Sequence, residues 1–325
     1  MSPPKVSVII PTWNGADVLA DALRCMHEQT VQDLEIIVAV DRSDDATAAI
    51  AAAAASQDAR IRPLVHRDRI GWVKNVNAAL DQVLGKYFCL YFHDDLIEPT
   101  YLEVLADHLD ADPSCVAAYC AVIQDSGASQ TVDQGRAYRG ETGERLLERM
   151  LLLPKGAPFR ALTRSSLLGQ GLRLPEGSFS GFQGQLAYLV RLVAAGEVHY
   201  DAAPLYRRRT WRQGALTRGW RSLPMADCIS DLRVVEADIA DVIDVAVPDP
   251  TERRAVLAAM RLTLAETLRS WERRVQANGL AALDEVFPGF DDFDAFPTRF
   301  RDGAMRIMDN IAKIEQRWRA EAQSK

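Results

Sequence analysis

Apolar residues in the first 110 positions fall into two alternating patterns. Short apolar blocks rich in β-branched residues predict buried strands at Lys5–Ile10, Leu34–Val40, Ile61–Val65 and Tyr87–Phe92. The segments between them, with helical spacing or a high alanine content, predict helices at Ala16–Gln29, Ala46–Ser56 and Trp72–Leu84. Apolar strands joined by helices are typical of a parallel sheet covered on both faces. The pattern therefore predicts an α/β fold with a mainly parallel sheet flanked by helices.

The rest of the chain is more helical. The pattern predicts a helix from Pro99 to about Asp110, a strand at Val116–Ile123, a polar surface loop at 124–143, and helices at 144–153 and 185–195. From about Leu223 the chain is helical almost throughout, with long pieces at 225–245, 251–278 and 303–322. We therefore expect one α/β domain over residues 1–220 and a helical C-terminal subdomain over residues 221–325.

The composition is that of an ordinary globular protein. Of the 325 residues, 48% are hydrophobic and 26% are charged, and the formal net charge is -7. No uninterrupted apolar stretch reaches about 18 residues, and Met1–Lys5 leads directly into a strand, so we expect no membrane span and a cytoplasmic location. The negative charge argues against nucleic acid as the main partner. The five cysteines form no C-x-x-C pair and are expected to be structural thiols.

Two adjacent carboxylates, Asp94 and Asp95, follow the fourth predicted strand. Ligands bind open α/β sheets at the carboxyl ends of the strands, and paired carboxylates repel each other unless a cation joins them. A divalent cation that also holds a nucleotide diphosphate would satisfy both conditions. The alternative is structural, because the pair could cap the helix that begins near Pro99.

Polar residues also follow the first two predicted strands. Pro11–Gly15 brings small polar groups and exposed backbone to a strand end where a nucleobase could be held, although its Asn-Gly pair also favours a simple turn. Asp41 could accept hydrogen bonds from a base or a ribose. Ser43 or Asp45 could instead cap the next helix.

The third predicted helix opens with Gly71–Asn77. Lys74 could lie near a diphosphate and Asn77 could join the hydrogen bonds at the sheet edge, although a lysine on a helix is usually solvated. Neither G-x-x-x-x-G-K-[ST] nor G-x-G-x-x-G occurs, so the chain lacks the P-loop and Rossmann fingerprints.

Four motifs occur in a fixed order: V-S-V-I-I-P-T-W-N, L-E-I-I-V-A-V-D-R-S-D-D-A-T, G-W-V-K-N-V-N-A-A-L and G-K-Y-F-C-L-Y-F-H-D-D-L-I-E-P. Together they resemble the family 2 glycosyltransferases, an inverting group with the GT-A fold. The resemblance is close from Lys5 to about Leu109, looser to about Arg209 and absent beyond. It implies a GT-A-like domain over residues 1–220, with a nucleotide half at about 5–110 and an acceptor half at about 111–220.

The resemblance also implies roles for site residues. Thr12 and Asp41 would contact the nucleobase, Asp94 the ribose, and Asp95 a Mn2+ or Mg2+ ion on the donor diphosphate. Because the family writes the acidic motif both as D-x-D-D and as x-D-D, Asp94 is the alternative metal ligand. The complete set of expected nucleotide contacts is Pro11, Thr12, Asn14, Asp41, Ser43, Lys74, Asn77 and Asp94.

The chain departs from the family at the general base. The family carries Glu-Asp at the start of a helix that here begins with Gly184 and Gln185, and an amide is not a base near pH 7. An inverting transfer needs a group that takes the proton from the attacking hydroxyl. Glu176 could reach the same cleft or could be a solvated loop residue. His199 and Asp201 are further candidates, but they lie on a predicted strand, where a structural role is more common.

Three consecutive arginines end the segment Pro204–Arg209. They could neutralise a leaving diphosphate, or they could form a basic edge strand that faces solvent.

The resemblance implies a metal-assisted, inverting glycosyltransferase that moves a sugar from a nucleotide-diphosphate sugar, expected to be UDP-linked, to a saccharide or lipid-linked acceptor in cell-surface glycan synthesis. The alternative is a catalytically degenerate sugar-nucleotide-binding protein with a regulatory or assembly role, which Gln185 would favour. A nucleotidyltransferase is a third class, but Pro11–Gly15 lacks the basic, glycine-rich character that triphosphate binding needs.

The last predicted helix carries an apolar stripe at Ile307, Ile311, Ile314 and Trp318. This stripe could pack on another helix of the chain, or it could join two copies in a homodimer. Mixed charges on the opposite face argue against a role at a membrane surface.

Overall fold

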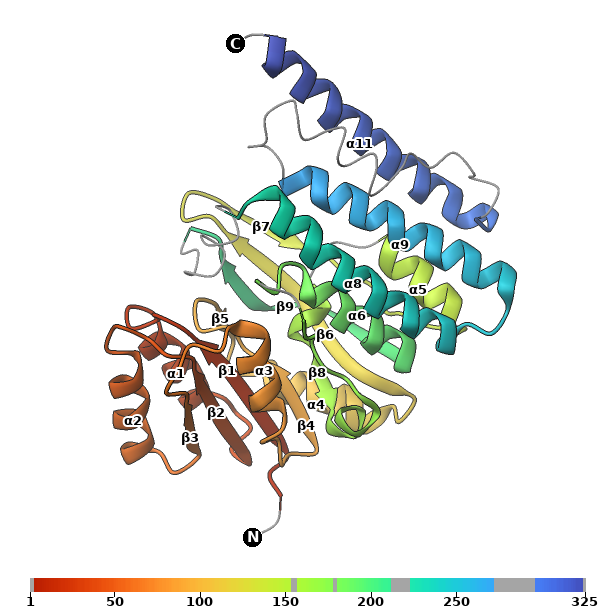
Figure 1. Cartoon of the computed structure of the whole chain (residues 1–325). Coiled ribbons are helices and arrows are strands. Elements are labelled where there is room, and N and C mark those ends of the chain that lie inside the picture. Colours follow the sequence, from red (N-terminus) through yellow and green to blue (C-terminus); the bar gives the residue numbers. More distant parts are fainter. Residues whose placement is uncertain (1–2, 153–156, 178–179, 212–222, 272–295, 324–325) are drawn as a thin grey trace.

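The computed structural model describes residues 3–152, 157–177, 180–211, 223–271 and 296–323. These residues form a nine-stranded sheet with helices on both faces, and the helices of the C-terminal part pack outermost on one side (Figure 1). The strands follow the order β3-β2-β1-β4-β8-β6-β9-β5, and β7 pairs with β6.

The N-terminal part of the sheet is parallel, as predicted. It consists of β1 (Val6–Thr12), β2 (Leu34–Val40), β3 (Ile61–Val65) and β4 (Tyr87–Leu90). β1 pairs with β2 and β4, and β2 pairs with β3. All residues of β2 are buried, because helices cover both faces of the sheet here. Thr12 lies opposite Val40 in the register, so the loops after β1 and β2 leave the sheet at the same edge.

Four helices cover this parallel region, namely α1 (Leu19–His27), α2 (Thr47–Gln57), α3 (Trp72–Leu80) and α4 (Tyr101–Ala111). Alternate residues of β1 face different layers: Val8 and Ile10 belong to one hydrophobic core with α1, α2 and α4, whereas Ile9 belongs to a second core with α3. The period-2 alternation of a strand therefore builds two cores from one apolar block.

The sheet becomes mixed after β4. The remaining strands are β5 (Leu96–Ile97), β6 (Cys115–Asp125), β7 (Gln130–Asp133), β8 (Leu162–Arg164) and β9 (Glu197–Arg209). β8 runs antiparallel to both β4 and β6, whereas β9 runs parallel to β6 and antiparallel to β5. The prediction that 124–143 is a surface loop was wrong for β7, which forms a hairpin with β6. Three of the four β7 residues are exposed, so no apolar pattern marks this strand.

The helices that cover the C-terminal half of the sheet belong to the same hydrophobic core as α3. The elements are α5 (Thr142–Leu151), the 3-10 helices η1 (Ala157–Arg160) and η2 (Ser165–Gln170), and α6 (Gly184–Ala195). Buried Arg145 of α5 donates hydrogen bonds to the carbonyls of Val193 and Ala194 at 3.0 and 3.2 Å. These bonds satisfy carbonyls that the end of α6 would otherwise leave unpaired.

Three long helices complete the chain: α8 (Met225–Ala246), α9 (Pro250–Trp271) and α11 (Thr298–Gln323). α8 packs on α6, α9 on α8 and α5, and α11 on α9 (Figure 1). Ile307 and Ile311 are buried in the core that α5 and α6 share. Ile314 is partly buried against the same core, so this part of the stripe packs within the chain. The homodimer stays a prediction. The side chain of Trp318 and the expected domain boundary at residue 220 lie outside the described residues.

Two expectations from composition can be compared with the structure. All five cysteines are free and buried, and burial raises the pKa of Cys89 to about 12, as expected of structural thiols. In the part of the chain that the structure describes, no helix is both long and apolar enough to cross a membrane.

Candidate active site

The loops after β1 and β2 are tied together by hydrogen bonds. Ser43 Oγ accepts one from the N–H of Asn14, and Asn14 Oδ1 accepts one from the N–H of Asp44, both at 2.9 Å. Thr47 Oγ1 accepts a third from the N–H of Gly15 at 2.9 Å. Asn14 has a φ of 47°, a left-handed conformation that asparagine tolerates better than most residues. Asn14 and Ser43, two predicted nucleotide contacts, thus hold these loops at the sheet edge.

Asp41 fixes a third loop at the same edge. Its side chain is buried, and the carboxylate accepts hydrogen bonds from the N–H groups of Arg42, Ile70 and Gly71, each at 2.9 Å. Gly71 precedes Trp72, so Asp41 also sets where α3 begins. A carboxylate has about four acceptor positions, which leaves one for a nucleotide. Residues 11–16, 41–47 and 67–71 are called the edge loops below.

A polar atom without a partner lies inside the edge loops. Thr12 Oγ1 is buried and has no hydrogen-bond partner in the described part of the structure. His93 Nδ1 lies 2.9 Å from the carbonyl oxygen of Pro11, which assigns the ring proton to Nδ1. A Cβ on Gly15 would lie 2.6 Å from Thr12 Oγ1, so only glycine fits there. A buried polar atom without a partner needs an explanation, and a bound ligand would supply one.

Asp95 is held inside the protein. It is 2% exposed, and its Oδ2 accepts hydrogen bonds from Tyr206 at 2.8 Å and from Arg160 at 3.2 Å. Its Oδ1 accepts one from the N–H of Arg209 at 3.2 Å. Desolvation raises the pKa of Asp95, and Arg160 supplies the compensating positive charge. Both carboxylate oxygens of Asp95 thus make contacts inside the fold. The expectation that Asp95 ligates a metal stays a prediction.

Asp94 has the opposite environment. It is partly exposed, and none of the other described residues is hydrogen-bonded to its carboxylate. Its main-chain carbonyl accepts a hydrogen bond from Arg209 Nε at 2.6 Å, which fixes the backbone. Arg208 on β9 is exposed, and its guanidinium interacts electrostatically with both Asp95 and Asp94. Among the described residues, an Asp94 carboxylate without a hydrogen-bond partner therefore interacts electrostatically with the guanidinium of Arg208 near the end of β9.

The donor groups here suit a cation that is shared with a substrate. The described residues contain no group of three or more His, Cys, Asp or Glu side chains that could hold a metal ion alone. Mg2+ is commonly held by one or two carboxylates together with substrate phosphates. The partly exposed Asp94 offers such a carboxylate, whereas the Asp95 carboxylate is buried.

The predicted contacts on α3 have different surroundings. Lys74 is exposed on the helix surface. Asn77 is buried and bonds both the carbonyl and the N–H of Leu174, at 3.0 and 3.1 Å. Asn77 Nδ2 also donates to Glu176 Oε1 at 3.1 Å, and Glu176 is exposed. Asn77 thus holds the segment that carries the candidate base.

The start of α6 lies next to α3. A Cβ on Gly184 would lie 3.5 Å from the Trp72 ring and 3.7 Å from Pro175, so the residue before the family's base position adjoins the segment of Glu176. Gln185 Nε2 donates to Gln183 Oε1 at 3.1 Å. Gln183 has a φ of 61°, which is left-handed. Residues 180–183 are called the α6 entry segment below.

The other base candidates lie far from this edge. Asp201 accepts a hydrogen bond from His108 Nε2 at 2.7 Å, and His199 stacks on His108 with ring centroids 3.8 Å apart. Both precede Arg209 on the same strand, and eight residues of strand span about 25 Å. His199 and Asp201 therefore belong to a separate cluster at the opposite end of β9.

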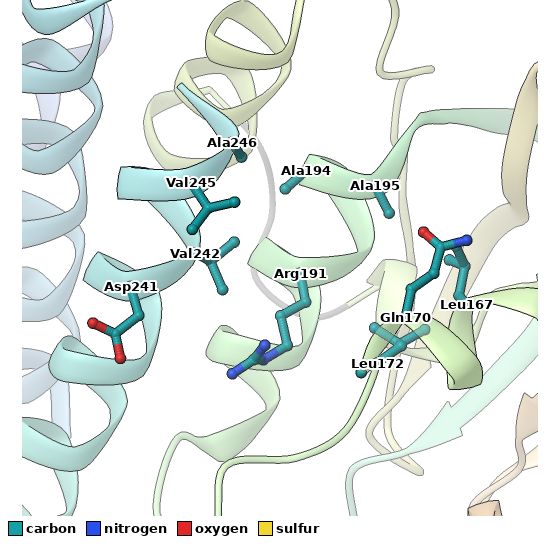
Figure 2. A pocket seen from close by; sticks show the side chains of 11 residues that line it. Leu167, Gln170, Leu172, Arg191, Ala194, Ala195, Asp241, Val242, Val245 and Ala246 are labelled. Atoms are coloured by element: carbon teal, nitrogen blue, oxygen red, sulfur yellow. The ribbon is translucent and has the colours of Figure 1, made fainter. Parts of the chain in front are cut away.

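An open groove of about 340 Å³ lies between η2, α6 and α8 (Figure 2). Its lining is largely apolar, with Leu172, Val242 and Val245 among the side chains and Arg191 and Asp241 as the charged ones. None of the predicted site residues lines it.

Three residues near the site escaped prediction. Arg160 and Tyr206 bind Asp95 from η1 and β9, and Arg69 stacks on Trp13 with its guanidinium carbon 3.4 Å from the ring centroid. No local sequence signal marks Arg160 or Tyr206, because their partner lies at least 65 residues away. Arg69 stands two residues before Gly71, where the third motif begins, and this position could have indicated it.

Parallel strands that end in polar loops and a carboxylate pair at one edge of the sheet form a ligand-binding edge, as the expected GT-A-like fold requires. The sequence profile described as Glycosyl transferase family 2 matches residues 7–171, just over half of the chain. The chain belongs to this family.

The chain is also similar in sequence to proteins that bear glycosyltransferase names. Over 213 residues the chain is 26% identical to EpsH of Bacillus subtilis, which bears a provisional glycosyltransferase name, and the match covers 64% of this chain and 62% of EpsH. Over 128 residues it is 30% identical to the GalNAc(5)-diNAcBac-PP-undecaprenol beta-1,3-glucosyltransferase of Campylobacter jejuni, covering 39% of this chain and 41% of that protein. The chain thus spans less than two thirds of either relative.

Solved structures share the fold at low sequence identity. The crystal structure of S. aureus TarS 1-349 in complex with UDP-GlcNAc matches with a TM-score of 0.69 and 17% identity, covering 98% of this chain and 92% of that one. The mannosyltransferase PcManGT from Pyrobaculum calidifontis, in complex with GDP-Man and Mn2+, matches with a TM-score of 0.51 and 16% identity, covering 98% of this chain and 88% of that one.

Proposed function

We propose that this protein transfers a sugar, with inversion, from a nucleoside diphosphate sugar to a saccharide or lipid-linked acceptor, and that the donor is a UDP-sugar. The observation that carries the proposal is the free Asp94 carboxylate at the sheet edge that also holds Thr12 and Asp41. The UDP-GlcNAc bound in the TarS crystal supports a UDP-sugar as donor. The Campylobacter relative is named for an undecaprenol-linked saccharide, which supports a lipid-linked acceptor.

The edge loops would hold the nucleoside. The unpartnered Thr12 Oγ1 and the remaining acceptor position of Asp41 would take hydrogen bonds from the base or ribose. The stacked Arg69 and Trp13 offer a flat cationic surface.

Asp94, with the donor diphosphate, would hold Mn2+ or Mg2+. When bound, the cation would stabilise the charge of the departing nucleoside diphosphate. Arg208 would place a second positive charge on the same diphosphate. Arg209, buried and bonded to the Asp94 carbonyl, would keep the carboxylate in position.

Glu176 would act as the general base. Its exposed carboxylate accepts a hydrogen bond from Asn77, which also binds the carbonyl of Leu174. The preceding residue, Pro175, lies next to the start of α6. Gln185 cannot accept the proton, because its amide is not basic near pH 7. Its hydrogen bond to Gln183 instead suits a role in shaping the part of the site formed by Glu176 and residues 180–185, which is called the acceptor side below.

One observation favours a second function. Gly184 and Gln185 leave the start of α6 without a carboxylate that could act as the base. The edge loops could still bind a sugar nucleotide, so the protein would then bind the donor without turnover. The two functions differ in donor hydrolysis, which a slow transferase would still show without an acceptor.

Calorimetric titration with UDP, GDP and dTDP, each with Mn2+ and with EDTA, would test the proposal alongside a donor-hydrolysis assay. We expect metal-dependent binding of UDP and slow hydrolysis of UDP-sugars. Binding without hydrolysis would favour the second function, and no binding of any nucleotide would contradict both.

A further inference from the structure

A buried carboxylate of the C-terminal helices reaches the α6 entry segment. Asp231 of α8 is fully buried, and its Oδ2 accepts hydrogen bonds from the N–H of Ser180 at 3.0 Å and from the N–H of Phe182 at 3.2 Å. The Ser180 hydroxyl donates to the same oxygen. An ionised carboxylate is stable in the interior only when such donors replace its water.

The α6 entry segment needs an external anchor. Gly181 has a φ of 69° and Gln183 a φ of 61°, so two of its four residues are left-handed. For a side-chain-bearing residue such as Gln183 this conformation persists only when the surrounding structure imposes it. The hydrogen bonds from Ser180 and Phe182 to Asp231 fix the backbone immediately before Gln183.

The same segment is held from the opposite side by the first residue of α3. Trp72 Nε1 donates a hydrogen bond to the Ser180 carbonyl at 3.1 Å. A Cβ on Gly181 would lie 2.2 Å from Trp72 Nε1, so only glycine allows this approach. Trp72 follows Gly71, which Asp41 holds. One continuous set of contacts therefore runs from Asp41 to Asp231.

We infer that Asp231 is a positioning residue for the acceptor side of the proposed site, acting through the α6 entry segment on Gln183 and Gln185. The inference rests on the proposed function. The C-terminal helices are then part of the active unit, because α8 sets the conformation of a segment that adjoins Glu176.

The same helix offers a matched control. Asp238, seven residues further along α8, forms an ion pair with Arg191 of α6, one of the side chains at the groove in Figure 2. Asp238→Asn removes a carboxylate from the same α6–α8 interface without touching the α6 entry segment. Ser180→Ala is a milder second variant, since it removes one donor to Asp231.

Three measurements on the full chain test the inference: amide hydrogen exchange, UDP titration with Mn2+, and acceptor transfer. For Asp231→Asn we expect exchange about 10-fold faster at the Ser180 and Phe182 amides and kcat for transfer about 30-fold lower, with the UDP Kd changed less than about 2-fold. Ser180→Ala should change exchange and kcat in the same direction by about 3-fold. Asp238→Asn should leave the exchange at the Ser180 and Phe182 amides and the kcat for transfer close to their wild-type values.

Unchanged exchange at residues 180–182 in Asp231→Asn, or an equal loss of kcat in Asp238→Asn, would overturn the inference. A wild-type protein that binds no nucleotide would refute the proposed function instead. Hydrogen exchange alone would then decide whether Asp231 holds the α6 entry segment, because that readout needs no substrate.

Discussion

The edge loops and the acceptor side of the site are held together in different ways. In the edge loops each contact joins neighbouring loops, as Asn14 does with Ser43 and Asp41 with Gly71, across 29 and 30 residues. On the acceptor side Trp72 reaches Ser180 across 108 residues, and Ser180 reaches Asp231 across 51. The edge loops are thus built by a local stretch of chain, whereas the acceptor side depends on contacts that form only in the complete fold.

Two adjacent residues show this contrast most clearly. Asp94 presents its carboxylate beside the edge loops, whereas Asp95 joins the long-range network of Arg160 and Tyr206. The two carboxylates are alike in sequence and opposite in surroundings. We expect their substitutions to affect different properties of the protein.

The largest effect is expected for Asp95→Asn. Arg160 would then keep a buried charge without its anionic partner, which costs about 3–5 kcal/mol in the free energy of unfolding. Urea denaturation would measure the loss, with Asp94→Asn as the control that keeps wild-type stability. Equal stability of the two variants would show that Asp95 is not part of the fold's interior network.

The next effect concerns the general base. Glu176→Gln keeps a carbonyl oxygen for Asn77 but cannot take a proton, so kcat for transfer should fall about 1,000-fold while the UDP Kd stays constant. Glu176→Asp should restore part of the rate. Full activity of Glu176→Gln in steady-state assays would exclude Glu176 as the base.

A smaller effect is expected for Asp94→Asn on nucleotide binding. Loss of the only free carboxylate of the pair should weaken UDP binding in the presence of Mn2+ about 100-fold and leave binding in EDTA unchanged. Calorimetric titration would compare the two conditions. A wild-type response to Mn2+ in this variant would assign the cation to another group.

The smallest effect is a pH dependence of stability. Desolvation raises the pKa of Asp21, but its bonds and charge interactions with Arg209 and Arg24 outweigh this and hold the pKa below the ordinary value of 3.8. A lowered carboxyl pKa stabilises the fold above the unfolded-state pKa, and this contribution is lost as the pH falls through the folded-state value.

Asp21→Asn should therefore cost less than about 1 kcal/mol at pH 7, and the difference from wild type should shrink below about pH 4. Thermal unfolding between pH 3 and 7 would measure it. A difference that is constant across this range would show that the Asp21 charge does not contribute.

Sequence reasoning succeeded where structure is local. β2 and β3 begin and end where the apolar blocks do, and Asp41 and Asn14 lie at strand ends as expected. It failed for β7, whose exposed residues carry no apolar pattern. It could not tell Asp94 from Asp95, since an Asp-Asp pair looks symmetrical in sequence and only the long-range contacts of Arg160 and Tyr206 distinguish its members.

The central claim is that Asp94 presents a cation to the donor diphosphate while Asp95 stays in the protein interior. A crystal structure with UDP and Mn2+, read by anomalous scattering from manganese, tests it most directly. We predict a peak about 2.1 Å from an Asp94 carboxylate oxygen and in contact with the diphosphate, with the Asp95–Arg160 pair intact. A peak on Asp95 with Arg160 displaced, or a bound diphosphate without manganese, would contradict the account.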